Sequence, residues 1–596
     1  MHLVAKTING SEYYYLVRKE RRGARVVTAQ TIYVGSREKL AQLAVQGACS
    51  SLPEAFRAQE IGASLALVRA AQSLDLERII DAVVPRRPGA AGVGRQLLIA
   101  AIHRAAAPVR RRSKSALREW YGGSALCELL PYEEAALDHR RVCETLLSLK
   151  PAQIDAIEER VVAQLVAREG LSLESLAFDT SNFDSWVGAR SKSRLLRRGH
   201  AKSGRPLRVL GFGLLVGEDD LPLLTFTYPG NENDQKAFGR FLRVLDRRMA
   251  TLKLPLQATV AADGGNVSRQ MVLKLEKRHR SYVVRLPRAH AKALERTGRK
   301  DLIALGGRFK GKVWALRHRT EVYGKLRCVL DVYSKRMRDK QLPGLRRDAR
   351  RTRGLLEALE ARLDRDREGR TRGRRATREI AVRRLAEALD REHMKDLFEA
   401  RIVDRDAGLA LDWHERAEGW DHLEDFVLGR TLLLTDRADW TPEQMVHAVR
   451  QQSRNEAMFR DLKDPSAVCM RPLRHRKDAA LRGHALVVVL GLVLGRLLVR
   501  RARRAGAPVP GMPALLDTLR SITRARMLPG PNAAPAVRGA ARSAWIPCER
   551  NERQNKLLAA LGLAASPELG ATSGNSPVRA RRGSARRKAT QPGGSR

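Results

Sequence analysis

The sequence is short of acidic residues, and this shortage sets the first limit on its function. Its 596 residues contain 65 Asp and Glu against 112 Lys and Arg, which gives a formal net charge of +47 and a pI of about 11.1. So large a positive charge on a folded chain implies a polyanionic partner. Nucleic acid is the first candidate for that partner, and an anionic membrane surface is the second.

Cysteine pairs and long apolar runs are also missing. The six cysteines include no C-x-x-C pair and no Cys/His cluster with zinc-finger spacing, so neither a disulfide framework nor a zinc finger is expected. The N-terminus has no apolar run, so no signal peptide is expected. The longest apolar run, Ala485 to Gly495, is too short to span a bilayer and predicts a buried helix. We therefore expect a cytoplasmic protein with reduced thiols and no membrane partner.

Hydrophobic residues make up 43% of the chain, enough for a sizeable core, and their pattern changes along the sequence. Residues 12–36 contain two β-rich runs around a glycine turn, which predict a small hairpin. Between residues 60 and 165 apolar residues recur at helical spacing. The region has a basic edge from Arg110 to Lys114, which would suit a DNA-binding domain. A helical scaffold that does not bind DNA explains the region equally well.

From residue 171 the sequence alternates between strands and helices. Three strands are predicted first, and the first of them ends at Asp179. A helix and a fourth strand follow, and the fourth strand ends at Asp263. Three antiparallel strands, a helix, a parallel strand and a helix form the order of an RNase H-like α/β fold. In that order the ends of the first and fourth strands are neighbours, so Asp179 and Asp263 are expected to lie close together.

The alternation stops at residue 290, where strand-like runs and densely charged helices indicate an α+β insertion into the core. The C-terminal end is rich in Gly, Ser, Pro, Arg and Lys, with seven basic residues and no acid in its last twenty. Such a tail is expected to be disordered. The predicted organisation is a hairpin region at 1–50, a helical DNA-binding domain at 51–168, the core at 169–289 and 436–530, the insertion at 290–435, and the basic tail at 531–596.

A helical stretch after the insertion carries a third acid. At about 100° per residue, Gln452, Glu456, Arg460 and Lys463 fall on one narrow face of this stretch. A carboxylate beside two cations suits a metal ion and a phosphate. The alternative is a solvated face with an i,i+4 pair between Glu456 and Arg460.

The three acids together suit a metal-dependent reaction at a phosphodiester. Mg²⁺ prefers oxygen ligands, so Asp179, Asp263 and Glu456 can hold two Mg²⁺ ions. Two such ions activate a water or a 3′-hydroxyl and stabilise the leaving oxygen. Asp184 is an alternative to Asp179 as the first ligand, although it lies beyond the predicted end of the strand.

At these residues the chain resembles bacterial insertion-sequence transposases of the DDE type, in the subgroup with a β-rich insertion before the catalytic Glu and the signature Y-x2-R-x3-E-x6-K. Each matching motif is short, but their order and spacing are specific. The matching stretches are Phe178-Asp179 to Asp184, Pro222 to Asp234, Ala262-Asp263-Gly-Gly, Glu456-x6-Lys463, Arg471-Pro-x-x-His475 and Arg482-Gly-His484.

The resemblance implies a transposase that binds the terminal inverted repeats of its element and catalyses Mg²⁺-dependent DNA cleavage and strand transfer. It implies that Asp179, Asp263 and Glu456 are both catalytic residues and metal ligands, with Mn²⁺ able to replace Mg²⁺. It also implies a homodimer in the complex with double-stranded terminal and target DNA, and a cytoplasmic, nucleoid-associated location in bacteria. The residues implied to contact DNA are Gln452, Arg454, Arg460 and Lys463.

The chain departs from the subgroup at two positions of the signature. Val449 stands at the Tyr position and Gln452 at the Arg position, both of which help members of the family to hold end DNA. Arg450, Arg454 and Arg460 are the candidates to replace the missing Arg. Two other functions stay open, a noncatalytic or decayed DNA-binding derivative and an RNase H-like nuclease without strand transfer.

Overall fold

The structure is a computed structural model that describes residues 2–22, 25–46, 55–85, 92–188, 191–199, 207–251, 258–262, 268–287, 297–528 and 545–569. The chain divides into two units. Unit 1 comprises Met1–Arg69, Glu119–Pro131 and Arg501–Arg596, so that it joins the two ends of the sequence. Unit 2 comprises Ala70–Arg118 and Tyr132–Arg500.

The central sheet of unit 2 mixes parallel and antiparallel strands. Its order is β11-β12-β13-β16-β10-β9-β5-β7-β6, and β8 also pairs with β7. β7 pairs in antiparallel direction with both β5 and β8, whereas β9 runs parallel to both β5 and β10. The strands expected from the sequence are therefore present with the expected directions. Their bounds are β5 Ser175–Ser185, β6 Arg197–Arg198, β7 Arg208–Val216, β8 Pro222–Pro229, β9 Thr259–Ala262 and β10 Tyr282–Leu286.

β5 is longer than the sequence predicts. The strand was expected to end at Asp179, but it continues to Ser185 because its residues stay paired with β7. Its described pairing with β9 ends where Phe178 lies beside Ala262. Asp179 therefore lies inside β5, at the first position beyond that pairing. Asp184, expected beyond the strand, lies inside it as well.

Aromatic side chains pack helix α9 (Asp234–Thr251) on one face of the sheet. Phe178 of β5 stacks on Phe241 of α9 with ring centroids 3.9 Å apart, and Phe238 contacts Phe178 edge-on at 5.4 Å. Successive side chains of a strand point to opposite faces. Asp179, which follows Phe178, therefore points to the face away from α9.

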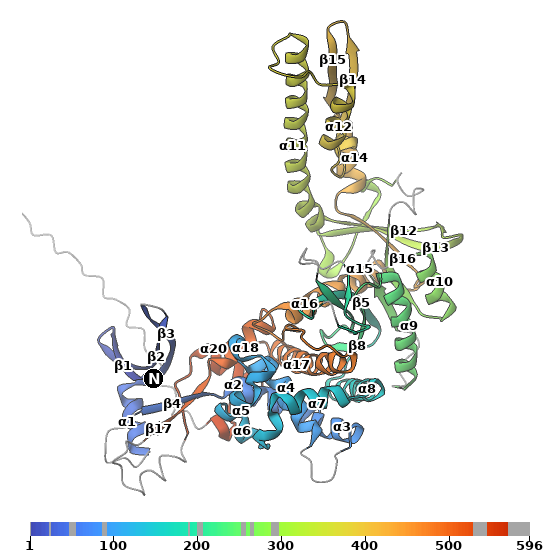
Figure 1. Ribbon diagram of the computed structural model, residues 1–596. Helices are drawn as coiled ribbons and strands as arrows, with labels where there is room; N and C mark the ends of the chain where they lie inside the picture. Colours follow the sequence, from blue (N-terminus) through green and yellow to red (C-terminus); the bar gives the residue numbers. More distant parts are fainter. Residues whose placement is uncertain are drawn as a thin grey trace, which may run out of the picture. The chain divides into compact units, whose positions relative to one another are not determined.

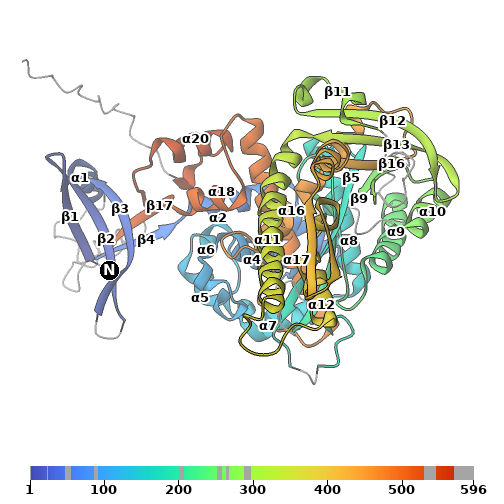
Figure 2. The same ribbon diagram turned by 90° about the horizontal axis from the view of Figure 1, so that it is seen from above.

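The region expected to be one insertion is divided between the sheet and a separate body. β11, β12, β13 and β16 belong to the central sheet (Figure 2). Seven consecutive residues of β13, Arg327 to Tyr333, are buried. Burial on both faces is typical of an interior strand, which explains why β13 lies within the sheet. The hairpin between β12 and β13 turns at Tyr323 and Gly324, whose φ angles of 53° and 77° suit a two-residue turn. The bounds are β11 Ile303–Ala304, β12 Val313–Val322, β13 Lys325–Ser334 and β16 Arg430–Thr435.

The separate body is formed by the residues that lie between β13 and β16 in the sequence, and it is made of helices and one hairpin (Figure 1). It has its own hydrophobic core, which contains Leu345, Leu356 and Leu363 of its first and longest helix. Its elements are α11 Lys335–Arg367, α12 Arg378–Ala388, α13 Met394–Leu397, β14 Phe398–Arg405, β15 Gly408–Glu415 and α14 Ala417–His422.

The stretch around Glu456 forms two helices rather than the one that was expected. α15 (Pro442–Arg450) starts with a capping box between Thr441 and Gln444. A turn at Gln451 ends it, and α16 (Gln452–Lys463) begins at the next residue. Residues 450–456 are all polar, so the apolar pattern of the sequence gives no signal of the break.

The other helices of unit 2 follow the expected periodicity, and α10 lies between β9 and β10. The predicted apolar run is buried within α17. Among the described residues, no helix combines the length and the hydropathy that a membrane span requires. The bounds are α3 Leu76–Val83, α4 Val93–Ala106, α7 His139–Ser148, α8 Pro151–Glu169, α10 Arg269–Lys277 and α17 Asp478–Arg504.

Unit 1 contains two small antiparallel sheets, β1-β2-β3 and β18-β17-β4. The expected N-terminal hairpin is present as β2 and β3, with β1 added. The part of the predicted tail that the structure describes is folded, since it contains β18 and α20. The bounds are β1 His2–Ile8, β2 Ser11–Arg22, β3 Arg25–Ser36, α1 Arg37–Gln46, β4 Ala55–Glu60, α2 Gly62–Ser73, α5 Leu117–Gly123, α6 Leu126–Leu129, α18 Met512–Arg520, β17 Thr523–Leu528, β18 Ile546–Pro547 and α20 Glu552–Ala560.

Candidate active site

Helix α16 packs on the part of the sheet that carries Asp179. It contacts β5 and β7, and Phe459 of α16 meets Phe212 of β7 edge-on with ring centroids 6.5 Å apart. Phe212 in turn meets Phe183 of β5 edge-on at 5.9 Å. Phe183 lies four residues after Asp179 and therefore shares its strand face. Three buried rings thus fix α16 against that face.

Lys463 links α16 directly to the same strand. Its ammonium donates a hydrogen bond to the Ser181 hydroxyl at 2.7 Å, and it lies 5.8 Å from the ring centroids of Phe183 and Phe459. Ser181 follows Asp179 by two residues, which is about 7 Å along a strand. The predicted phosphate contact Lys463 is therefore held close to the predicted first acid, on the same face of β5.

The two predicted strand acids differ in what the structure describes. Asp179 is half-buried, and its Oδ1 accepts a hydrogen bond from the Thr180 N–H at 2.7 Å. Asp263 lies outside the described residues. The residue before it, Ala262, pairs with Phe178, the residue before Asp179. The sheet therefore brings the chain segments that precede both acids side by side, as the sequence predicts.

Glu456 is exposed on α16. It precedes Lys463 by seven residues, which is about two helical turns, so both side chains leave the helix on the same side. The exposed Arg460 lies between them. The elements that carry Asp179, Glu456 and Lys463 thus meet on one face of the sheet.

The donor atoms on this face suit a hard cation. Carboxylates from Asp179 and Glu456 are oxygen ligands, which Mg²⁺ prefers over nitrogen or sulfur. Among the described residues, no three His, Cys, Asp or Glu side chains come together as metal ligands. The third member of the predicted set, Asp263, is not among those residues.

Two predicted DNA contacts are placed differently from expectation. Gln452 is only 8% exposed, so its amide lies in the interior rather than beside the exposed Glu456. The reason is the break at Gln451, because the first turn of α16 packs inward and also buries Asn455 completely. Arg454 forms an ion pair with Asp220 at 3.2 Å, in the turn between β7 and β8.

Val449, at the other departing position of the signature, is a core residue. It is 6% exposed and packs in a hydrophobic cluster with Phe309, Met445 and Leu433. A buried valine cannot offer the hydrogen bond or the ring that a tyrosine would give to DNA. The signature's Tyr and Arg contacts are therefore both missing from the surface of this chain.

The two histidines of the matching C-terminal motifs have local partners or are buried. Nε2 of His484 lies 2.8 Å from the Met470 carbonyl oxygen, and its Nδ1 lies 3.2 Å from the Lys114 ammonium. Burial holds the pKa of His484 well below its usual value and lowers the pKa of His475 to about 3. Both rings are thus neutral at pH 7.

Ser181 and Phe183 contact Lys463, and the sequence alone did not identify them as site residues. Their signal is the spacing from Asp179, since residues two and four positions further along a strand share its face. That signal becomes readable only once β5 is known to continue beyond Asp179.

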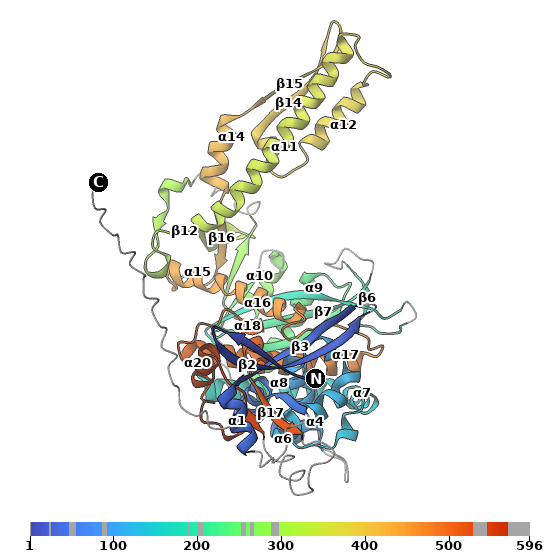
Figure 3. The same cartoon turned by 90° about the vertical axis from the view of Figure 1, so that its left-hand side faces the viewer.

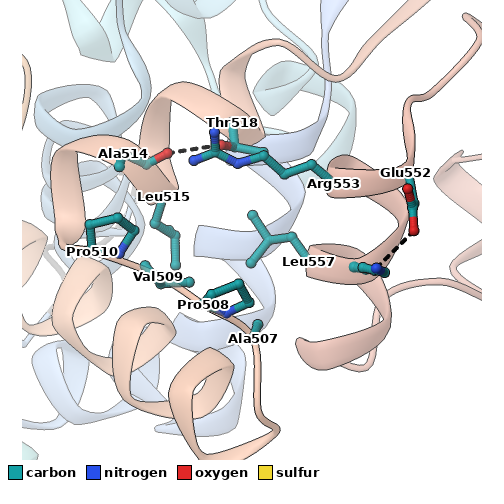
Figure 4. A pocket seen from close by; sticks show the side chains of 11 residues that line it. Ala507, Pro508, Val509, Pro510, Ala514, Leu515, Thr518, Glu552, Arg553 and Leu557 are labelled. Atoms are coloured by element: carbon teal, nitrogen blue, oxygen red, sulfur yellow. Dashed lines mark hydrogen bonds and ion pairs between the residues drawn. The ribbon is translucent and has the colours of Figure 1, made fainter.

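A hollow of about 450 Å³ lies in unit 1, between the loop at residues 507–510, α18 and α20 (Figure 4). Its lining is mainly apolar and includes Pro508, Leu515 and Leu557. At one side the Thr518 hydroxyl donates to the Ala514 carbonyl at 2.9 Å. None of the predicted site residues lines it, so it gives no alternative centre for the chemistry.

No protein-family model matches the chain, and no curated protein matches it. Among solved structures, the chain shows a likeness to a piggyBac transposase in a synaptic complex with hairpin DNA, determined by cryo-EM. The likeness covers 83% of this chain and 86% of that chain, with 8% sequence identity and a TM-score of 0.35. A TM-score this low does not establish a shared fold, so neither fold nor function is inferred from it.

Proposed function

We propose that unit 2 contains an RNase H-like core and that the chain is a DNA transposase of the DDE type. In this proposal Asp179, Asp263 and Glu456 are the catalytic residues. The observation that supports it most is the hydrogen bond from Lys463 to Ser181. It holds the helix of Glu456 over the strand face of Asp179, beside the end of β9.

Asp179, Asp263 and Glu456 would hold two Mg²⁺ ions, which Mn²⁺ could replace. When bound, these ions supply an activated water or 3′-hydroxyl and stabilise the leaving oxygen. The chain itself would provide the remaining contacts to the nucleic acid. Lys463 lies on the face of Asp179 and would contact a phosphate oxygen, and the exposed Arg460 lies one turn before it.

The proposed partners are the double-stranded terminal repeats of an insertion sequence and the target DNA, bound by a homodimer in bacterial cytoplasm. The net charge of +47 supports a polyanionic partner of this kind. A noncatalytic DNA-binding derivative is the second candidate, and the burial of Val449 and Gln452 favours it. A nuclease without strand transfer is the third.

The test is cleavage of a duplex that carries the terminal repeats, with Mg²⁺ present. Asp179→Asn and Glu456→Gln should each abolish cleavage, because a metal ligand is lost. Both should leave binding measured in EDTA within about twofold, because binding rests on Lys and Arg contacts. Asp184→Asn is the matched control, since Asp184 lies on the same strand but points to the opposite face.

Each outcome identifies a different assignment. Normal nicking by Asp179→Asn with loss of nicking by Asp184→Asn would make Asp184 the first ligand. A wild-type chain that binds the repeats but never cuts them would be the noncatalytic derivative. Cleavage without joining of the 3′-end to a second duplex would indicate the nuclease.

A further inference from the structure

A group of arginines lies beside the end of α15. Arg308, in the turn Gly307–Phe309, and Arg450, the last residue of α15, both lie over the Phe309 ring. Their guanidinium carbons are 5.0 and 4.9 Å from the ring centroid. Within the described part of the chain, neither arginine forms an ion pair with an acid.

A third arginine and a neutral histidine complete this group. Burial, followed by the charges of Arg308 and Arg336, lowers the pKa of Arg450. Arg336 is the second residue of α11. His447, one turn before Arg450, has its pKa lowered to about 4, first by burial and then by Arg308 and Arg454. It is therefore uncharged at neutral pH, and the three like charges repel one another until an anion binds.

Helix α11 continues this positive charge away from α15. Its first nineteen residues contain nine Lys or Arg and two Asp. At 100° per residue, Arg336, Lys340, Arg347 and Arg351 fall within about 60° of one another and extend over about 22 Å. All four are exposed. Helix α11 rises from the part of unit 2 that contains α15 (Figures 1 and 3).

The acids of this half-helix do not neutralise that face. Asp339 lies 3.3 Å from Arg338, and Asp348 forms an ion pair with Arg391. The opposite side of α11, which includes Leu345 and Leu356, is buried in the core of the separate body. The helix is thus held by its apolar side and presents its cationic side outward. We call the exposed set the cationic track, which consists of Arg308, Arg450, Arg336, Lys340, Arg347 and Arg351.

We propose that the cationic track is a docking surface for the sugar–phosphate backbone of double-stranded DNA. Guanidinium groups bind phosphate oxygens in pairs of hydrogen bonds, which gives both charge and geometry. The length of about 22 Å corresponds to about six nucleotides of one strand at 3.4 Å each. This inference deepens the proposed function, and it supplies a backbone contact near α16 where the buried Gln452 offers none.

The experiment measures binding of the full chain to a fluorescent duplex of about 20 base pairs and arbitrary sequence, in EDTA over a range of salt. The variant is Arg308→Ala/Arg336→Ala/Arg450→Ala. The control is Arg374→Ala/Arg384→Ala/Lys395→Ala, which removes the same charge from exposed positions of the separate body that lie outside the cationic track. The variant should raise Kd at least tenfold at about 0.1 M salt. It should also reduce the slope of log Kd against log salt by roughly two to three, because each phosphate contact contributes about 0.9. The control should change Kd less than about twofold.

Two further measurements decide how the result is interpreted. The same three positions changed to Lys keep the charge but lose the paired hydrogen bonds. They should restore the salt dependence and bind more tightly than the alanine variant, which separates loss of charge from misfolding. Equal losses in the variant and the control would overturn the proposal, because charge alone would explain both. Polyglutamate of equal charge that binds wild type as tightly as the duplex would also overturn it in favour of an acidic protein partner. Because EDTA prevents cleavage, failure of the catalytic assignment leaves this result unaffected.

Discussion

Residue 452 illustrates how a side chain on the expected face of a helix can still be buried. Its helical angle relative to Glu456 is compatible with exposure, and the sequence alone predicts that an Arg at this position tightens binding to end DNA. The break at Gln451 changes this expectation, because Gln452 opens a new helix and lies in the interior. Gln452 and Asn455, which begin α16, thus pack in the interior and do not form a surface for DNA.

Gln452→Arg should therefore destabilise unit 2 rather than improve DNA binding. An unpaired charge in the interior costs roughly 3 kcal/mol or more. Urea denaturation followed by circular dichroism measures this change. Arg460→Ala, on the exposed side of the same helix, is the control and should change stability by less than about 0.5 kcal/mol. An unchanged midpoint together with tighter duplex binding would show that position 452 reaches the surface.

Buried histidines should make unit 2 sensitive to mild acid. Burial lowers the pKa of His103 and of His475 to about 3, and holds that of His484 well below its usual value. In the unfolded chain these groups titrate near 6.5. Below that pH the unfolded state binds protons that the folded state excludes, so stability falls as pH falls.

The expected slope is about 1.4 kcal/mol per pH unit for each of these histidines between pH 6.5 and 5. Urea midpoints at pH 7.5 and 5.5 give the measurement. His414→Gln, at an exposed position, should leave the pH dependence unchanged, whereas His484→Gln should reduce it. A midpoint that rises on acidification would contradict the prediction.

At the scale of elements, α16 and α17 are joined by a buried ion pair. Asp461 of α16 and Arg496 of α17 are 2.5 Å apart, and each side chain is 6% exposed. Burial raises the pKa of Asp461 to about 6, although Arg496 opposes that shift. The pair therefore fixes the helix of Glu456 to the long helix behind it, at a cost in desolvation.

Removing one partner of this pair should cost more than removing both. Arg496→Met alone leaves a buried carboxylate unpaired and should destabilise unit 2 by about 3 to 5 kcal/mol. Asp461→Leu/Arg496→Met should recover most of that loss, since apolar replacements of similar volume are often tolerated. Thermal denaturation of the single and double variants measures both changes. Additive losses would show that the two residues act independently.

The elements of the core could be predicted because their apolar periods are local. β5, β7, β8 and β9 each follow from a short apolar run, and their directions follow from the connections between them. The extension of β5 beyond Asp179 could not be predicted, because it depends on pairing with β7 through polar residues. The addition of β13 and β16 to the sheet depends likewise on partners far away in sequence.

The candidate site could be predicted in part for the same reason. Asp179, Glu456 and Lys463 were found by residue type and spacing, and the structure places their elements on one face. Arg308 could not be connected with Arg450 from the sequence, because only the fold brings that turn to the end of α15.

At the scale of the whole molecule, truncation can separate the C-terminal residues that stabilise unit 1 from those that contribute only positive charge. Glu568 lies 2.6 Å from Arg69, and Leu569 is only 2% exposed. The residues from 570 onward contain seven Lys or Arg and no acid. The contacts of Glu568 and Leu569 are thus followed directly in the sequence by a basic segment.

A chain ending at Leu569 should keep its thermal midpoint but bind arbitrary duplex more weakly, with a smaller dependence on salt, because fewer counterions are released. A chain ending at Ala565 should also lose roughly 1 to 3 kcal/mol of stability, because a buried leucine and an ion pair are removed. Calorimetry and salt-dependent binding of the two truncations separate these effects. Equal midpoints would show that residues 566–569 do not contribute to the stability of unit 1.

Unit 1 contains chain segments that are synthesised at the beginning and at the end of translation. β4 lies within the first sixty residues. It pairs with β17 in antiparallel register from Thr523–Glu60 to Leu528–Ala55. β17 is made only after residue 522. Throughout translation of unit 2, β4 therefore lacks its native neighbour. An exposed strand edge of this kind can pair with other nascent chains. Misassembly of this architecture is therefore most favoured when several ribosomes translate one message close together. Slow synthesis of the last hundred residues would prolong the exposure of the β4 edge.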